Sequence, residues 1–269
     1  MGVFEAIALG VVQGLTEFLP VSSTGHLILA RELFHVDDSY ALAFDAILHL
    51  ATAAAVIVYF WKDILVLINT ALRKLSRLPV NQSDLTLLYA ILIGTIPAVV
   101  LGLSFESMME SYFRHPLLVA LVLIAGSIFF MYAEWVYMHN HQANDLTVKK
   151  GFKIGLFQSL ALIPGMSRSG STIAGAMLLG FTRSEAARFA FLLAVPVILG
   201  AGMKKLLELI VSDVGVEWTA VGVGAVTAFL TGLFAVHFMI SFVRKHTLWP
   251  FIWYRIILAA FVIFVVLYG

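Results

Sequence analysis

Long apolar runs alternate with short polar segments along the whole chain. A helix that crosses a bilayer needs about 20 predominantly apolar residues. Six runs meet that requirement and are predicted to be membrane-spanning helices: Leu42–Trp61, Leu85–Phe105, Leu117–Tyr137, Ala186–Leu206, Trp218–Val243 and Leu248–Tyr268. Two further apolar stretches, Val3–Leu19 and Phe152–Ile163, are shorter and lead into polar loops. The pattern predicts an all-α polytopic membrane protein, with residues 1–269 forming a single integral-membrane domain.

The two shorter stretches have the same layout. Each is followed by a polar loop that contains a proline, in GLTEFLPVSSTGH (Gly14–His26) and IPGMSRSGST (Ile163–Thr172), and then by another short arm. An ordinary extramembrane turn would explain the turn residues, but neither arm is long enough to cross a bilayer. We therefore expect two re-entrant helix–loop–helix hairpins whose tips meet inside the bundle, where non-helical backbone is buried or faces a water-filled cavity. The first helix should stop at Pro20, and the next should start near Ser22 or Ser23.

Several spacings recur in the same order in the two halves of the chain. The spacing of Pro20 and Phe44 resembles that of Pro164 and Phe189. Gly10 and Gly14 are spaced like Gly151 and Gly155, and Gly94 and Gly102 are spaced like Gly224 and Gly232. These spacings predict two repeats of opposite topology, about 1–138 and about 151–269. Paired interrupted segments in inverted repeats indicate a site near the membrane midplane, at the interface between the repeats.

The loop charges predict the orientation, because cytoplasmic loops carry an excess of Lys and Arg. One side of the predicted bundle holds Lys62, Arg73, Lys74, Arg77, Lys149, Lys150, Lys153, Arg183, Arg188, Arg244 and Lys245. The other side holds only Arg31, Arg114, Lys204 and Lys205. We assign the richer side to the cytoplasm. The first hairpin then enters from outside and the second from the cytoplasm.

Composition narrows the function classes. Only 12% of the residues are charged and 61% are hydrophobic, whereas a soluble domain is about 25% charged. The net charge of +1 and the lack of a basic tract give no electrostatic case for a nucleic-acid partner. The absence of cysteine excludes disulfides and thiolate metal sites. The N-terminus has no basic segment of the kind that opens a cleavable signal peptide, so none is expected.

Polar chemistry concentrates in the two loops. Gln13 and Glu17 are four residues apart and share a helix face, and a carboxylate in an apolar helix indicates a functional site. Arg168 in the second loop is a permanently charged fork suited to phosphate or carboxylate. A purely structural ion pair with Glu17 is the alternative, but it leaves the crowded hydroxyls unexplained. Ser23 and His26 supply a nucleophile and a proton acceptor on one helix face.

These residues carry a family resemblance. The stretches Q13-GLTEFLPVSSTGH26 and P164-GMSRSGST172 resemble those of the bacterial undecaprenyl-diphosphate phosphatase family, which is associated with bacitracin resistance. The resemblance extends over nearly the whole chain, through F44-DAILHL, G94-TIPAVVLGL, F191-LLAVP and I252-WYR255. It implies hydrolysis of undecaprenyl diphosphate, a long-chain prenyl diphosphate lipid, to the monophosphate carrier that cell-wall peptidoglycan synthesis uses. It also implies a helical bundle with two re-entrant hairpins in the bacterial inner membrane.

Roles follow residue by residue from the resemblance. The expected catalytic residues are Glu17, Ser23, His26 and Arg168. The expected diphosphate-binding residues are Ser22, Thr24, Ser167, Arg168, Ser169, Gly170 and Thr172. The family needs a divalent cation, Mg²⁺ or Ca²⁺, which Glu17 and Gln13 are expected to hold; Gln13 leaves one carboxylate there rather than two. Asp45 and His49 receive no role.

Alternatives stay open at this level. Ser23 attacks phosphorus with His26 as the proton acceptor, or His26 is itself the nucleophile. A transporter or flippase of prenyl phosphate lipids shares the inverted repeats and broken helices, but it has no need of the nucleophile. An acid-phosphatase-type lipid phosphatase is disfavoured, because Ala174 stands where a histidine would follow Arg168. The sequence is also compatible with a homodimer. The hairpin directions predict a site reached from the outer face.

Overall fold

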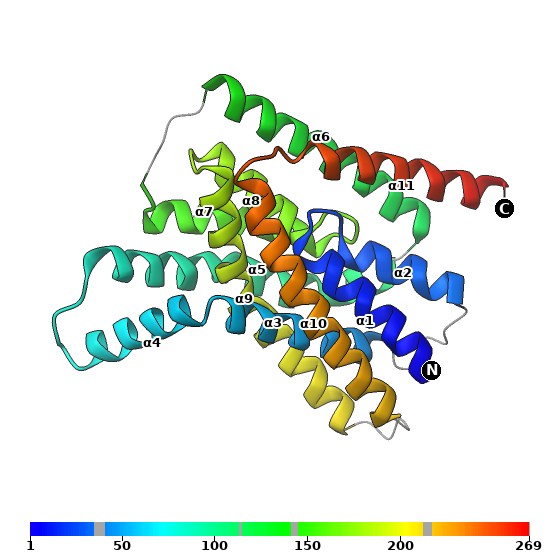
Figure 1. Ribbon diagram of the computed structural model, residues 1–269, viewed down its shortest axis with the longest axis horizontal. Coiled ribbons are helices and arrows are strands. Elements are labelled where there is room, and N and C mark those ends of the chain that lie inside the picture. Colours follow the sequence, from blue (N-terminus) through cyan, green and yellow to red (C-terminus); the bar gives the residue numbers. More distant parts are fainter. Residues whose placement is uncertain (35–40, 113–114, 141–144, 212–216, 269) are drawn as a thin grey trace.

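The computed structural model describes residues 1–34, 41–112, 115–140, 145–211 and 217–268. Regular structure within these ranges is helical throughout, which confirms the predicted all-α class (Figure 1). The helices are α1 (Val3–Phe18), α2 (Ser23–Phe34), α3 (Ala41–Tyr59), α4 (Trp61–Leu75), α5 (Gln82–Tyr112), α6 (Pro116–Asn140), α7 (Val148–Ser159), the 3₁₀ turn η2 (Leu160–Leu162), α8 (Arg168–Leu178), α9 (Arg183–Val211), α10 (Trp218–Val243) and α11 (Trp249–Tyr268). Arg114, assigned above to the outer side, lies outside the described residues.

The membrane-spanning helices differ from the prediction at one place. In the described ranges, α5, α6, α9, α10 and α11 are long and apolar enough to cross a bilayer, and the bent pair α3–α4 makes a sixth candidate. The predicted span Leu42–Trp61 ends early, at Tyr59, where the chain turns by 85° into α4. The segment from Lys62 to Asp84, predicted as a loop, is therefore largely helical. Lys62, Asp63, Arg73 and Lys74 lower the hydropathy of α4, but they belong to an amphipathic helix whose buried positions are Leu67 and Thr70.

Both predicted hairpins are present as pairs of short helices in contact. The helix α1 ends at Phe18, two residues before Pro20, and α2 begins at Ser23 as expected. The second pair consists of α7 with η2 and then α8; the Thr147 hydroxyl caps α7 by accepting from the Lys150 amide at 3.2 Å. Each α-helical arm has 16 residues or fewer, too short to cross a bilayer alone. Their re-entrant path through a membrane stays a prediction.

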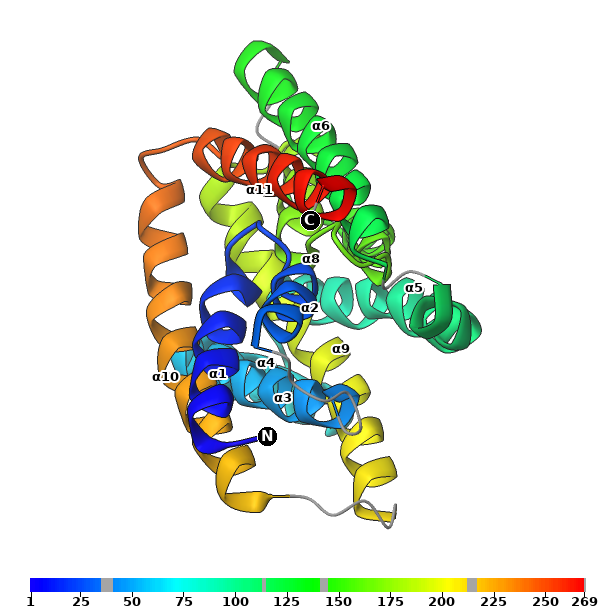
Figure 2. The same cartoon turned by 90° about the vertical axis from the view of Figure 1, so that its right-hand side faces the viewer.

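Each hairpin packs against a long helix from the other half of the chain. The helix α1 lies along α10, as Figure 2 shows, and α7 lies along α5. Glycines make both contacts possible: a side chain at Gly14 would overlap Ala228 and Gly232 of α10, and one at Gly155 would overlap Gly94 of α5. Without side chains at these points, the backbones approach closely. The long helices also pair, α3 with α9 and α6 with α11.

Aromatic packing fixes the end of α1 that carries the carboxylate. Phe18, fully buried, meets Phe191 of α9 edge to face with ring centroids 5.4 Å apart. Phe60, at the α3–α4 bend, adds a third ring, 6.4 Å from Phe191. Such aromatic pairs stabilise by about 0.5–1.5 kcal/mol beyond their buried area. Because Phe18 directly follows Glu17, this cluster limits where the Glu17 carboxylate can lie.

Ion pairs join helix ends that the charge pattern assigns to the cytoplasm. Arg188 of α9 pairs with Asp63 of α4, and Arg183 of α9 pairs with the buried Glu134 of α6. Glu134 also accepts from the Leu248 amide at 2.6 Å, which ties in the start of α11. Both ion pairs therefore lie at the start of α9, whose Arg183 and Arg188 are predicted to face the cytoplasm.

Candidate active site

The two loops share an unusual local structure. Ser22 precedes α2 with φ 76°, and Ser167 precedes α8 with φ 74°. Each hydroxyl accepts from the amide three residues later, from Gly25 at 3.4 Å and from Gly170 at 3.2 Å. A non-glycine residue at positive φ is strained, and such strain clusters at functional sites. In both loops the residue that follows, Ser23 or Arg168, lines the same cavity.

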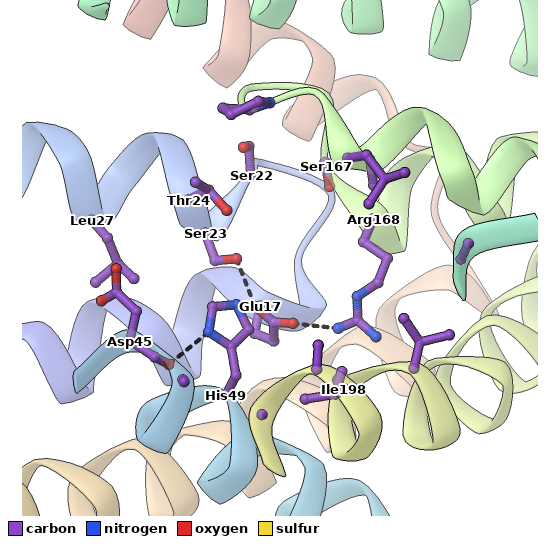
Figure 3. A pocket seen from close by; sticks show the side chains of 18 of the residues that line it. Glu17, Ser22, Ser23, Thr24, Leu27, Asp45, His49, Ser167, Arg168 and Ile198 are labelled. Atoms are coloured by element: carbon purple, nitrogen blue, oxygen red, sulfur yellow. Dashed lines mark hydrogen bonds and ion pairs between the residues drawn. The ribbon is translucent and has the colours of Figure 1, made fainter. Parts of the chain in front are cut away.

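Glu17 lies at the centre of the polar contacts. Its carboxylate Oε2 accepts from the Ser23 hydroxyl at 2.6 Å and from Gln13 Nε2 at 2.8 Å, and Arg168 Nη2 donates to Oε1 (Figure 3). His49 Nε2 is 3.5 Å from Oε2. The Glu17 side chain is only 3% exposed, so the guanidinium and the hydroxyl replace its lost hydration. The predicted meeting of the two loops is therefore observed, through Glu17, Ser23 and Arg168.

A cavity of about 300 Å³ opens beside this cluster. Its polar lining is Glu17, Ser22, Ser23, Thr24, Asp45, His49, Gln158, Ser167, Arg168 and Lys205. Its apolar lining includes Leu27, Ala98, Leu162, Val197 and Ile198. The polar groups come from both hairpins and from α3 and α9, whereas the apolar lining comes mainly from α9 and from η2 and the loop after it. The cavity therefore combines groups that can bind an anion with apolar surface that can contact hydrocarbon.

His26 does not line this cavity. Its Nδ1 is 2.8 Å from the Ser22 carbonyl and its Nε2 is 2.7 Å from the Tyr254 hydroxyl, with the two rings stacked 5.6 Å apart. Because a carbonyl only accepts, Nδ1 carries the proton and Nε2 accepts from Tyr254. Ser23 and His26 are three residues apart on α2, but the expected pairing of the hydroxyl with the imidazole is not formed. The hydroxyl donates to Glu17 instead.

The residues predicted to bind diphosphate divide into two groups. Ser22, Thr24, Ser167 and Arg168 line the cavity. Ser169, Gly170 and Thr172 do not: the Ser169 hydroxyl donates to the Leu19 carbonyl at 3.0 Å, and the Thr172 hydroxyl donates to the Arg168 carbonyl at 2.7 Å. Gly170 lies where a side chain would overlap Phe130. The Ser169 hydroxyl thus links the two hairpins and the Thr172 hydroxyl bonds within α8, while a role of these three residues in binding diphosphate stays a prediction.

Sequence reasoning missed part of the site. Asp45 and His49 of α3 line the cavity; Asp45 accepts from Arg31 Nη1 at 2.8 Å, and His49 Nδ1 is 2.7 Å from the Asp45 carbonyl. The available signal was their four-residue spacing inside an apolar span, which places both polar side chains on one helix face. Gln158 also lines the cavity, and neither polar atom of its buried amide has a hydrogen-bond partner. Its place six residues before Pro164 parallels that of Gln13, seven before Pro20.

The cation expected on Glu17 and Gln13 stays a prediction; of their side-chain oxygens only Gln13 Oε1 has no hydrogen-bond partner in the structure. Both Glu17 oxygens are engaged, by Arg168 on one side and by Ser23 and Gln13 on the other. Gln13 is fully buried and does not line the cavity. Among the described residues no group of three His, Asp or Glu side chains comes together. A Ca²⁺ site built by protein alone needs more ligands than this, because Ca²⁺ takes 6–8 oxygen ligands. These residues alone therefore form no preformed metal centre.

Comparison with known proteins gives a consistent result. The family described as bacitracin resistance protein BacA matches residues 6–261. A protein named undecaprenyl-diphosphatase from Marinobacter nauticus is 40% identical over 268 residues, covering 99% of this chain and 100% of its own length. Proteins of the same name from Moorella thermoacetica and Rubrobacter xylanophilus are 40% and 41% identical, each covering at least 96% of both chains. The chain therefore belongs to the bacitracin resistance protein BacA family.

Proposed function

We propose that this protein hydrolyses undecaprenyl diphosphate to undecaprenyl phosphate and inorganic phosphate, and so recycles the lipid carrier of cell-wall synthesis. The observation that carries the proposal is the meeting of a hydroxyl, a carboxylate and a guanidinium at one cavity, in a chain whose relatives are named for this activity. Phosphoryl transfer depends mainly on positioning and on stabilising charge, which is what these three groups supply.

Ser23 is the proposed nucleophile. Its oxygen bonds to the terminal phosphorus while the bond from that phosphorus to the bridging oxygen breaks, and undecaprenyl phosphate leaves. The Ser23 proton passes to Glu17 Oε2, which already accepts it in a 2.6 Å hydrogen bond. Water then attacks the phosphoserine, the Ser23–phosphorus bond breaks, and both water protons leave with the released phosphate while Glu17 returns its proton to Ser23. The geometry supports Glu17 rather than His26 as the proton acceptor, since both ring nitrogens of His26 are engaged elsewhere.

Arg168 is the proposed anion clamp. Its Nη2 binds Glu17, but its buried Nη1 has no hydrogen-bond partner. An unpaired buried guanidinium nitrogen is costly, and a phosphate oxygen in the cavity would satisfy it. Arg168 opens α8 and Ser23 opens α2, so the positive ends of two helix dipoles also face the diphosphate. A divalent cation, Mg²⁺ or Ca²⁺, would bind together with the diphosphate rather than to the protein before the substrate arrives.

The lipid tail and the direction of entry follow from the cavity walls. Ala98, Val197 and Ile198 offer apolar contacts for the first units of the prenyl chain. Lys205 and Asp45 also line the cavity, and Lys205 belongs to the sparsely charged side of the predicted bundle. With the orientation derived from the loop charges, that side is the outer face of the bacterial inner membrane. We therefore place the entrance on the outer face.

Phosphate release from purified protein tests the proposal. Detergent-solubilised protein supplied with undecaprenyl diphosphate and Mg²⁺ or Ca²⁺ should release inorganic phosphate, and the Arg168→Ala variant should lose most of this activity. A transporter of prenyl phosphate lipids is the rival function, since it needs the anion clamp but not the nucleophile. Absence of phosphate release from folded protein, with lipid translocation in proteoliposomes, would favour the transporter.

A further inference from the structure

Arg255 of α11 is fully buried and binds the backbone of both active-site loops. We infer that Arg255 is a positioning residue: it holds the two loops at the separation that brings Ser23 and Arg168 to one cavity. The inference rests on the proposed function, because it assigns a role in that reaction to a residue that touches neither the cavity nor the diphosphate.

The guanidinium makes contacts in three directions. Its Nη1 donates to the Pro20 carbonyl of the first loop at 3.4 Å, and its Nη2 donates to the Gly165 carbonyl of the second loop at 3.0 Å. From α6, the Leu123 carbonyl accepts from Nη2 at 3.1 Å and the Ser127 hydroxyl accepts from Nε at 3.2 Å. The rigid fork therefore joins both loops to the α6–α11 pair.

The anchored carbonyls occupy matching positions in the two loops. Pro20 lies three residues before Ser23, and Gly165 lies three residues before Arg168. Gly165 has φ 99°, a conformation that favours glycine, so its carbonyl direction is set by a turn that other residues rarely adopt. Because only three peptide units separate each anchor from the cavity-facing residue, the distance between Ser23 and Arg168 depends on these anchors.

The buried positive charge of Arg255 makes its hydrogen bonds to the two loops necessary. Within the described part of the chain no carboxylate pairs with Arg255; its partners are three carbonyl oxygens and one hydroxyl. A buried cation without hydrogen bonds is unfavourable, so displacement of either loop would leave part of the guanidinium unsatisfied. The Phe130 ring, whose centroid is 4.7 Å from the guanidinium carbon, covers it. Phe130 also contacts Gly170 beside Pro20, which links the same cluster to the start of α8.

Gly126 of α6 leaves the space that the guanidinium occupies. A methyl group built there would overlap Arg255 Nη2. The Gly126→Ala variant should therefore displace the fork without changing any charge. It provides a second route to the same effect if the Arg255→Lys variant does not fold.

Kinetics and hydrogen exchange together test the inference. Arg255→Lys keeps the charge, but a single ammonium cannot reach both loops and α6 at once. We expect kcat to fall by about tenfold or more, since small misplacements of reacting groups cost up to about 10²-fold, and KM to rise several-fold because Arg168 is misplaced. Amide exchange in residues 19–23 and 163–167 should accelerate, with the rest of the bundle unchanged. Gly126→Ala should change the same quantities in the same direction.

The matched control is Arg183→Lys, which weakens another largely buried arginine that bridges α6 and α9 away from the cavity. It should lower the melting temperature but leave KM and loop exchange at wild-type values. The inference is wrong if Arg255→Lys and Gly126→Ala keep the wild-type KM and loop exchange and lose activity only in proportion to folded protein. If the wild-type protein releases no phosphate, the proposed function fails, while the loop exchange still decides whether Arg255 positions the loops.

Discussion

Ser23 and His26 lie on the same short helix, yet only Ser23 faces the cavity. Sequence spacing predicts that residues three apart share a helix face, but it does not show which of them faces the cavity. The contacts that decide this are Glu17 with Ser23, and Tyr254 with His26. Tyr254 is 228 residues from His26 along the chain, so this pairing was beyond the reach of local patterns.

Replacing Ser23 by alanine tests the nucleophile. Loss of the attacking oxygen should reduce phosphate release by about 10³-fold or more, and acid quenching of the wild-type reaction should trap an acid-stable phosphoserine at Ser23. The matched control is Thr16→Ala, which removes a hydroxyl that only donates to the Val12 carbonyl of its own helix. An acid-labile phosphoryl group mapped to His26 would instead support the imidazole as nucleophile.

The Glu17–Arg168 pair allows stability and catalysis to be separated. Glu17→Gln leaves the Arg168 guanidinium without its counter-ion and should destabilise the protein by about 1–3 kcal/mol, less than a fully enclosed pair because Arg168 is 16% exposed. The double variant Glu17→Gln, Arg168→Gln should recover part of that stability. Both the single and the double variant should remain far slower than the wild-type protein, since a general base contributes about 10²–10⁴-fold to the reaction rate. Thermal unfolding and phosphate release measure the two effects, and recovery of activity in the double variant would contradict the assignment.

Cation binding should depend on the substrate. Because Glu17 is already paired and Gln13 is buried away from the cavity, the protein alone should show no Mg²⁺ binding by titration calorimetry at micromolar concentrations. Adding a non-hydrolysable prenyl diphosphate should produce binding, as Mg²⁺ is commonly held by one or two carboxylates and substrate phosphates. Tight, stoichiometric binding to the protein alone would show that the Glu17 side chain rearranges to form a metal centre.

At the scale of helices, apolar run length predicts α5, α6, α9, α10 and α11 well, because long spans depend on local composition. The amphipathic α4 was missed, because its charged residues are typical of a loop in a membrane protein. The structure shows that Leu67 of this helix packs on the bundle. The division into inverted repeats stays a prediction. It is supported by the exchange of partners, with α1 on α10 and α7 on α5. Most of the glycines that first indicated it lie at these contacts, although Gly102 faces Leu162 of η2 instead.

Two glycine substitutions test the helix contacts. Gly155→Ala places a methyl group against the Gly94 backbone and should destabilise the protein by about 1–3 kcal/mol through overpacking. Gly200→Ala, in α9, meets nothing within 4 Å and should be neutral or stabilising, since alanine favours helix by about 1 kcal/mol over glycine. Thermal unfolding in one detergent compares them. Equal melting temperatures for the two variants would mean that α7 and α5 are not in close contact.

For the whole molecule, the remaining question is which end faces outward. Figure 1 shows the N- and C-terminal ends at the right and the α4–α5 connection at the left. The basic residues that pair as Arg188 with Asp63 and Arg183 with Glu134 belong to the predicted cytoplasmic end. The positive-inside rule thus predicts that Ser76, after α4, is cytoplasmic and that Glu217, before α10, is outside.

A chain without cysteine allows this orientation to be measured directly. In intact bacterial cells a membrane-impermeant maleimide should label Glu217→Cys, and should label Ser76→Cys only after permeabilisation; both positions are exposed. Ala201→Cys, at an exposed position of the cavity lining, should also be labelled from outside, and added prenyl diphosphate should slow that labelling. Labelling of Ser76→Cys alone in intact cells would invert the topology. Labelling of Glu217→Cys but not Ala201→Cys would keep the topology and contradict the outward cavity entrance. A water-soluble reagent cannot cross the bilayer, so it cannot reach from outside a cavity that opens only to lipid or to the cytoplasm.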